Sequence, residues 1–160
     1  MSETTRSGAT TELTAGGLTL APGGILRRGE HWTTALNRNQ NLLGKVMLVA
    51  NRPVERVTEL TAAEWADLHS EMRKVTAALV GAFQPDHFNY AFLQNQDRQV
   101  HLHVIPRYAA ARTFAGLVFA DPDYPDHYAV PAPVRILDPD IRDALAELLR
   151  GLLRTHSRVV

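Results

Sequence analysis

The sequence predicts an α+β domain, in which a mostly antiparallel sheet carries one long helix and a second helix follows at the C-terminus. Four short apolar runs alternate with polar turn residues, which is the pattern of strands joined by short connections. An amphipathic segment with helical spacing lies between the second and third runs, and another begins at residue 138. A chain of 160 residues is long enough to form one domain with a buried core.

Composition narrows the classes of partner. Hydrophobic residues make up 45% of the chain and charged residues 21%, which are ordinary values for a globular protein. The 17 basic and 17 acidic residues balance, so no overall positive field attracts a nucleic acid. The chain has no cysteine, which excludes thiol catalysis and fits a reducing compartment. We find no apolar segment of signal-peptide or membrane-span length, and therefore expect a cytoplasmic protein with no membrane partner.

The first 20 residues are rich in Ser, Thr and Gly. Such a composition buries too little apolar surface to offset the entropy of ordering the chain. We therefore expect residues 1–20 to form a flexible N-terminal tail, and residues 21–160 to form a single domain.

The strands are predicted from the apolar runs and the turn residues between them. Residues 37–41 are rich in Asn and, with Gly44, suit a hairpin connection, while residues 95–98 suit a tight turn into the last strand. Because each turn reverses the chain, the pairing should be mostly antiparallel. The four predicted strands are residues 31–36, 46–50, 88–93 and 99–105.

The long helix is predicted from its start signal and its apolar stripe. Thr61 and Glu64 have the spacing of a capping box, in which each side chain satisfies a free backbone N–H of the other residue. Apolar residues then recur at intervals of three and four, which gives one face that can pack on the sheet. The members of this stripe are Trp65, Leu68, Met72, Val75, Leu79 and Phe83.

The C-terminal helix is predicted over residues 138–154. Asp138 suits the N-cap and Pro139 the first helical position. Its apolar stripe, expected in core or dimer packing, comprises Ile141, Leu145, Leu148, Leu149 and Leu152. The preceding residues 109–137 are predicted to form an irregular loop, and its segment 119–133, rich in Pro and Asp, is a candidate to wrap over a partner subunit.

The most informative feature is the run Gln-Val-His-Leu-His-Val-Ile-Pro-Arg-Tyr at residues 99–108. Side chains of a strand alternate between its two faces, so Gln99, His101 and His103 should share one face and the apolar residues between them the other. Imidazole can act as a nucleophile, a general acid or base, or a metal ligand near neutral pH. Two imidazoles on one face therefore indicate a chemical site.

The histidine pair has two other interpretations. Both rings could be ordinary polar positions on a half-exposed sheet face. They could also begin a metal site, but such a site needs a third and usually a fourth ligand. Residues 106–112 contain no carboxylate, and the other five histidines stand apart in the sequence. We therefore predict no metal site.

The run of strand, Asn-containing turn and histidine strand ending in Ile105-Pro106-Arg107 resembles the histidine-triad (HIT) superfamily of nucleotide hydrolases and transferases. Residues 48–68, LVANRPVERVTELTAAEWADL, resemble the strand–Arg-Pro-Val–helix passage of the branch that includes the dinucleoside polyphosphate hydrolases. The similar regions span about residues 32–108. In the family motif His-φ-His-φ-His-φ-φ, where φ is apolar, His101 takes the middle position and His103 the last.

The resemblance implies a HIT-like fold and an enzyme acting at the α-phosphate of a nucleotide. His101 would attack the phosphorus and form a covalent nucleotidyl-histidine that water later hydrolyses, while His103 would stabilise charge on the phosphoryl oxygens. The implied substrates are dinucleoside polyphosphates or nucleoside phosphoramidates, and the implied assembly is a homodimer. No cofactor is required, although Mg²⁺ is a candidate companion of a polyphosphate substrate.

The resemblance also implies roles for four residues outside the histidine pair. Asn95 matches a phosphate-contacting amide of the family, and Gln94 is the alternative alignment. Asn37 matches a position near the ribose hydroxyls, and the competing role is a turn Asn bonded to its own backbone. Arg107 is expected either to contact phosphate or to form a structural ion pair.

Two positions depart from the family pattern. Gln99 stands where the family has its first triad histidine, and Leu43-Gly44-Lys45 stands where it has Pro-Gly-His. An amide could bind phosphate or hold His101 in place, but it cannot transfer a proton by titrating. Lys45 could serve a polyphosphate or simply be solvated. A catalytically weak nucleotide-binding protein, acting as a sensor or scaffold, is therefore the alternative to an enzyme.

Overall fold

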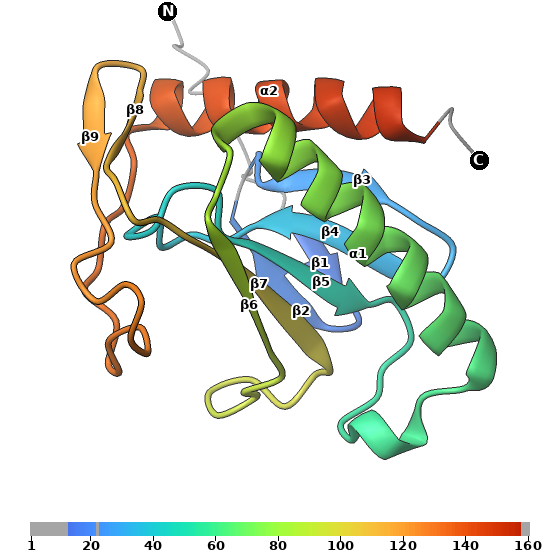
Figure 1. Ribbon diagram of the computed structural model, residues 1–160. Helices are drawn as coiled ribbons and strands as arrows, with labels where there is room; N and C mark the ends of the chain where they lie inside the picture. The colour runs from blue at the N-terminus through green and yellow to red at the C-terminus, as the bar shows by residue number, and fades with distance from the viewer. Residues whose placement is uncertain (1–12, 22, 158–160) are drawn as a thin grey trace, which may run out of the picture.

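The computed structural model describes residues 13–21 and 23–157. At its centre lies a five-stranded antiparallel sheet in the order β3-β4-β5-β7-β6 (Figure 1). The prediction of an α+β fold with a mostly antiparallel sheet and two helices is confirmed. The strands are β3 (Ile25–Arg28), β4 (Trp32–Leu36), β5 (Val46–Ala50), β6 (His87–Ala91) and β7 (His101–Arg107).

The sheet differs from the predicted strands at three places, the first of which is β6, which spans residues 87–91 instead of the predicted 88–93. The edge strand β3 is absent from the prediction. The last strand begins at His101 rather than at residue 99, and residues 92–100 form a longer connection than the predicted tight turn. Gln99 lies outside the strand because its side chain bonds to the backbone at the end of β5 and just after it.

Helix α1 (Ala62–Phe83) begins with the predicted capping box. The Glu64 N–H donates to Thr61 Oγ1 over 3.1 Å, and the Thr61 N–H donates to Glu64 Oε2 over 2.8 Å. A short 3₁₀ helix, η1 (Val57–Glu59), precedes it. Most of the predicted stripe packs on the sheet, but Trp65 is 42% exposed and instead meets the edge of the Phe92 ring.

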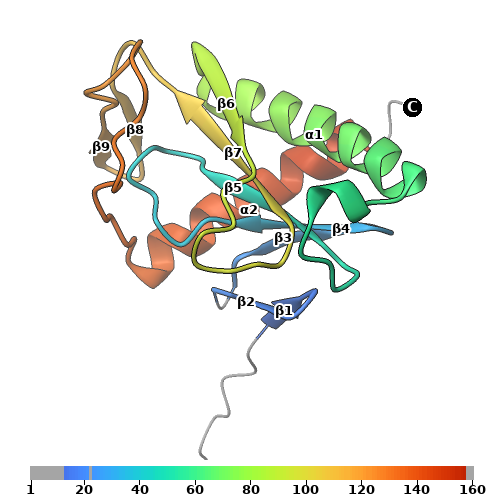
Figure 2. The same ribbon diagram turned by 90° about the horizontal axis from the view of Figure 1, so that it is seen from below.

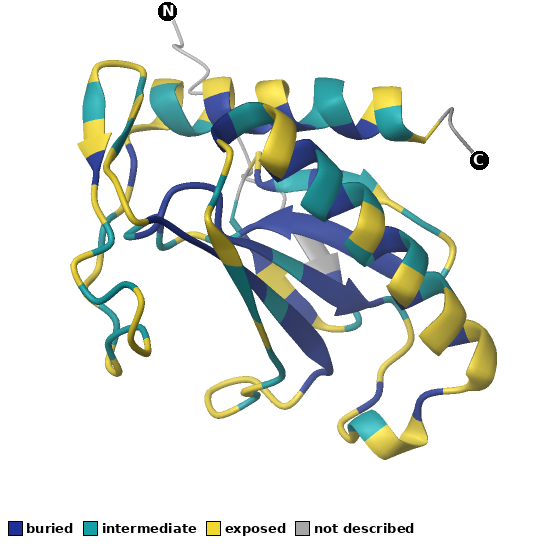
Figure 3. Ribbon diagram, in the orientation of Figure 1, coloured by how far each residue is buried: buried dark blue, intermediate teal, exposed yellow. Residues whose placement is uncertain are grey.

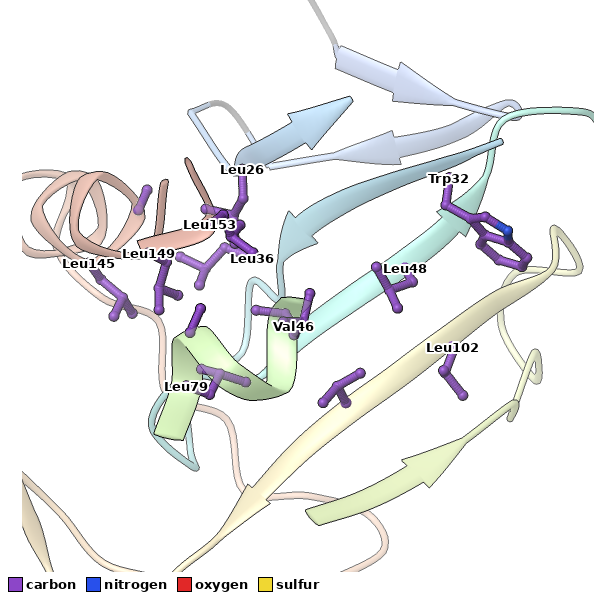
Figure 4. Close-up of a cluster of buried hydrophobic side chains, with 14 of the residues drawn as sticks. Leu26, Trp32, Leu36, Val46, Leu48, Leu79, Leu102, Leu145, Leu149 and Leu153 are labelled. Atoms are coloured by element: carbon purple, nitrogen blue, oxygen red, sulfur yellow. The ribbon is translucent and has the colours of Figure 1, made fainter. Parts of the chain in front are cut away.

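Helix α2 (Pro139–His156) lies against α1 and β3. Figure 4 shows Leu145, Leu149 and Leu153 of this helix directed toward the core. Leu148 of the predicted stripe is exposed, and Leu153 is buried in its place. The helix thereby covers the end of the sheet that α1 leaves open (Figure 1).

The two faces of the sheet are covered differently. Alternate residues of β5 and β7, among them Leu48, Leu102 and Val104, join the main core under the helices (Figure 4). Ala35 and Val49 face the other side and belong to a second, smaller core. Figure 3 shows that β4 and β5 are almost entirely buried between these two layers.

The second core is closed by a hairpin in a segment predicted to be a flexible tail. Strands β1 (Leu13–Ala15) and β2 (Leu18–Leu20) pair antiparallel and lie on the sheet face opposite the helices (Figure 2). Leu18 and Leu20 are buried there. The prediction is therefore wrong for residues 13–20, because their alternating pattern places leucines on one face; residues 1–12 lie outside the described residues.

The predicted irregular loop at residues 109–137 also contains a small hairpin, β8 (Arg112–Phe114) and β9 (Leu117–Phe119). The following segment, residues 120–137, returns to the β4–β5 connection of the same chain. The Gln40 N–H donates to the Arg135 carbonyl over 2.9 Å, and Asn39 pairs with Ile136. Within the described part of the chain, no helix has both the length and the apolar character needed to cross a bilayer.

Candidate active site

His101 and His103 project from the same face of β7, as the alternation predicts. Their cross-strand partners on β5 are Val49 and Met47, and Leu102 between them points into the main core. The two ring centroids lie 4.9 Å apart with the planes at 72°. His101 is buried and His103 is partly exposed. Two imidazoles are thus held edge to face at one point of the sheet.

The protonation pattern of His101 follows from its backbone contact. Its Nδ1 atom lies 2.6 Å from the carbonyl oxygen of Gln99. A carbonyl oxygen can only accept, so Nδ1 carries the hydrogen and the neutral ring has its lone pair on Nε2. The geometry therefore presents Nε2 of His101 as the nucleophilic atom.

His103 has the opposite tautomer. The side-chain oxygen of Asn37 accepts a hydrogen bond from the Asn39 N–H over 2.9 Å, so the Asn37 amide nitrogen faces His103 Nδ1, 3.5 Å away. Nδ1 then accepts and Nε2 bears the hydrogen. Burial, with smaller effects of the neighbouring His101 and Lys45, lowers the pKa of His103 to about 4. His103 is therefore a neutral hydrogen-bond donor at pH 7.

Gln99 contributes differently from the prediction. Its amide nitrogen donates to the carbonyls of Ala50 and Arg52 over 2.8 and 2.9 Å, and its oxygen accepts from the Val54 N–H over 3.1 Å. A Cβ at Gly16 would collide with that nitrogen, so the β1–β2 hairpin closes over the amide. Both N–H groups are used, which contradicts a phosphate contact. The backbone of Gln99, and not its side chain, orients His101.

Lys45 is buried rather than solvated. It is 8% exposed, and its amine donates to Asn41 Oδ1 over 2.8 Å. Burial lowers the pKa of its ammonium group to about 8. Lys45, Asn37 and His103 all line one cavity of about 160 Å³, which Tyr128 helps to close. The structure thus brings a cation, an amide and an imidazole to one small space.

A larger cavity of about 610 Å³ is also lined by Asn37. Its apolar walls include Leu20, Leu36 and Met47, and Gln40 and Arg142 contribute polar groups. Asn37 lines both cavities. The sequence prediction missed the contribution of Leu20, although the alternation Leu18-Thr19-Leu20 was a signal for a strand that reaches this wall.

Of the two roles predicted for Arg107, the structure shows the structural ion pair. It is 2% exposed, and its guanidinium donates to Asp121 over 2.6 and 3.2 Å. It also donates to Asn89 Oδ1 and to the carbonyl of Asp126, both over 2.8 Å. With its donors engaged in this way, the guanidinium is not available to phosphate.

The two predicted phosphate amides of the 92–100 connection do not reach the histidines. Gln94 donates to the carbonyls of Glu55 and Arg98 over 2.8 and 2.7 Å and so braces the loop. Asn95 is exposed. No hydrogen bond among the described residues joins either amide to His101 or His103. In the same part of the chain, no three His, Cys, Asp or Glu side chains converge as a metal site.

Comparison with known proteins identifies the family of this chain. Residues 21–110 match the model of the HIT domain. The bis(5'-nucleosyl)-tetraphosphatase (asymmetrical) of Schizosaccharomyces pombe is 30% identical over 91 residues, which are 54% of this chain and 50% of that protein. The alignment thus spans about half of the relative's length.

Two solved structures show the same fold. A histidine triad protein from Marinobacter aquaeolei has a TM-score of 0.68 and 22% identity, covering 82% of this chain and 88% of its own. The diadenosine triphosphate hydrolase of Plasmodium falciparum has a TM-score of 0.66 and 14% identity, covering 93% of this chain and 88% of its own. The family match extends over more than half of the 160 residues and includes the paired histidines, and the chain therefore belongs to the HIT domain family.

Proposed function

We propose that the protein cleaves nucleotides at the α-phosphate through a nucleotidyl-histidine on His101. The observation that carries this proposal is the complementary protonation of the two rings. His101 offers an Nε2 lone pair, held by the Gln99 carbonyl, and the neighbouring His103 offers an Nε2 hydrogen. A nucleophile beside a preorganised donor is what attack at a phosphoryl group requires.

The reaction proceeds in two displacements. Nε2 of His101 donates its electron pair to the α-phosphorus, a P–N bond forms, and the bond to the leaving group breaks with its electrons. Water then attacks the same phosphorus, loses a proton to solvent and releases the nucleotide, and His101 regains its lone pair. His103 donates a hydrogen bond to a phosphoryl oxygen in both steps.

The two cavities suggest how a nucleotide lies in the site. The apolar walls at Leu36 and Met47 suit a nucleobase, and Asn37 lies between that cavity and His103, where a ribose would connect base and phosphate. A divalent cation on a polyphosphate would enter as part of the substrate. The polyphosphate of a dinucleoside polyphosphate is our preferred leaving group, because it departs as a stable anion.

The protein is further proposed to act as a homodimer. Strand β6 is an edge of the described sheet, and its Tyr90 is 43% exposed. Leu93, in the connection that follows β6, is 46% exposed. A second copy can pair antiparallel with this edge and cover both side chains. Light scattering should report twice the chain mass, and Tyr90→Asp should shift the protein to monomer; a monomeric wild type would exclude this assembly.

The function is tested by AMP release from diadenosine polyphosphates and adenosine phosphoramidates, with and without a chelator. His101→Ala should abolish release, whereas His69→Ala, at an exposed position on α1, should retain it. With substrate labelled at the α-phosphate, wild type quenched in alkali should carry an acid-labile label that His101→Ala lacks.

Turnover that survives in His101→Ala would refute the mechanism. Tight AMP binding without turnover by wild type would establish the nucleotide-binding protein instead.

A further inference from the structure

Lys45 is a buried cation that no carboxylate of the described residues pairs with. Its amine makes one side-chain hydrogen bond, to the neutral amide of Asn41. None of the ion pairs formed within residues 13–21 and 23–157 includes Lys45, whereas the chain's other lysine, Lys74, pairs with Glu71. Removing an ammonium group from water without an anionic partner is costly, and such groups are usually paired or functional.

The surroundings of the Lys45 amine favour an anion. The cavity of about 160 Å³ places His103 from β7, Asn37 and Asn41 from the β4–β5 connection, and Tyr128 from the 120–137 segment around it. None of these side chains is an acid that is ionised at pH 7. The carboxylate of Asp121, in the segment after β9, is already paired with Arg107 of β7.

We propose that this cavity is an anion site in which the Lys45 ammonium binds a phosphate oxygen of the nucleotide held at His101 and His103. The inference rests on the proposed function and extends it to a residue that the histidine pair does not include. Because His103 is a neutral donor at pH 7, it supplies a hydrogen bond but no charge to a phosphate. Lys45 supplies that charge, and its partial desolvation makes the interaction stronger than at an exposed site.

The burial of Lys45 also predicts how the site responds to its ligand. Its ammonium has a pKa of about 8 in the free protein, because it is desolvated without a counter-charge. A bound phosphate should raise the pKa of Lys45. AMP affinity should therefore fall as the pH rises through 8, as the amine loses its proton. Among the described residues, the other titratable or charged groups around this region are His101, His103, Tyr128 and the Arg107–Asp121 pair.

The first test measures binding of AMP and adenosine by calorimetry. Lys45→Met should weaken AMP binding by about ten- to hundredfold, the effect of one charge-assisted hydrogen bond, and leave adenosine binding within about twofold. Lys45→Arg should retain most of the AMP affinity, because it keeps the charge. Equal weakening of both ligands, or none, would overturn the proposal.

The second test uses the unmodified chain and so does not depend on how a variant folds. Lys45 and Lys74 are the only lysines, so a protein labelled with ¹³C-lysine gives two Cε signals. Saturation with AMP, but not with adenosine, should raise the pKa of the Lys45 signal, and Lys74 on α1 serves as the internal control. AMP binding that leaves the Lys45 titration unchanged would overturn this inference alone. A wild type that binds neither ligand would overturn the proposed function with it.

Discussion

The ring of His101 and the backbone carbonyl of Gln99 lie 2.6 Å apart, from Nδ1 to oxygen. Gln99 lies just before β7, and its side chain is tied to the backbone at the end of β5 and after it by three hydrogen bonds. The side chain therefore fixes the peptide, and the peptide fixes the ring. A residue that cannot titrate thereby sets which nitrogen of its neighbour is free to react.

Substituting Gln99 with Ala removes a buried amide and leaves two carbonyls and one N–H without partners. Each uncompensated group costs about 1–3 kcal/mol, so the free energy of unfolding should fall by several kcal/mol. Urea unfolding measures this loss. The matched control is Gln96→Ala, which removes the same side chain from an exposed position of the same connection and should be nearly neutral. A Gln99→Ala protein as stable as wild type would show that these three side-chain hydrogen bonds do not hold the peptide in place.

His103 makes stability depend on pH. Its pKa is lowered from 6.5 to about 4, so the unfolded chain binds a proton there before the folded protein does. The stability that comes from keeping His103 unprotonated is fully present above pH 6.5 and is lost as the pH falls toward 4. Between pH 7 and pH 5 wild type should lose about 2 kcal/mol more of its unfolding free energy than His103→Asn, which does not titrate. Equal losses in the two proteins would show that His103 titrates normally.

The ion pair of Arg107 and Asp121 predicts a loss of stability without a direct loss of phosphate binding. Arg107→Met leaves the carboxylate of Asp121 buried and unpaired, which should cost about 3–5 kcal/mol in unfolding free energy. The double variant Arg107→Met/Asp121→Leu should recover much of that loss. At a temperature where Arg107→Met is folded, calorimetry should find AMP affinity close to wild type. A selective loss of AMP affinity would instead restore the phosphate-binding role.

The features that could be predicted from the sequence depend on local geometry. Alternation along a strand places His101 and His103 on one face, and the spacing of Thr61 and Glu64 starts the long helix. Both follow from residues close together in the chain. The order of strands and turns also follows from local patterns, and the family resemblance was based on that order.

The features that were missed depend on partners far away in the sequence. Gln99 leaves the strand face because Ala50 and Arg52 accept its amide hydrogens, and no pattern around residue 99 encodes those contacts. Lys45 is enclosed partly by Tyr128, which arrives from the segment after β9. The phosphate role of Arg107 is displaced by Asp121, whose position the sequence pattern leaves open.

The leaving group should decide which substrates the site cleaves well. The departing amine of a phosphoramidate needs a proton, whereas a polyphosphate leaves as a stable anion. Neither neighbour of His101 on the histidine run supplies such an acid at pH 7, because Gln99 cannot titrate and the pKa of His103 is about 4. The proposed role of the Lys45 ammonium is to keep its charge on a phosphate oxygen. General acid catalysis contributes about 10²–10⁴-fold, so kcat/KM for diadenosine tetraphosphate should exceed that for adenosine phosphoramidate by at least about 100-fold. At saturating substrate, phosphoramidate turnover should rise as the pH falls from 8 to 6, while polyphosphate turnover should change little. His101→Ala gives the background rate for each substrate. A phosphoramidate cleaved as fast as the polyphosphate at pH 8 would mean that the folded site supplies a proton donor, and Lys45→Met would then tell whether that donor is the Lys45 ammonium or His103.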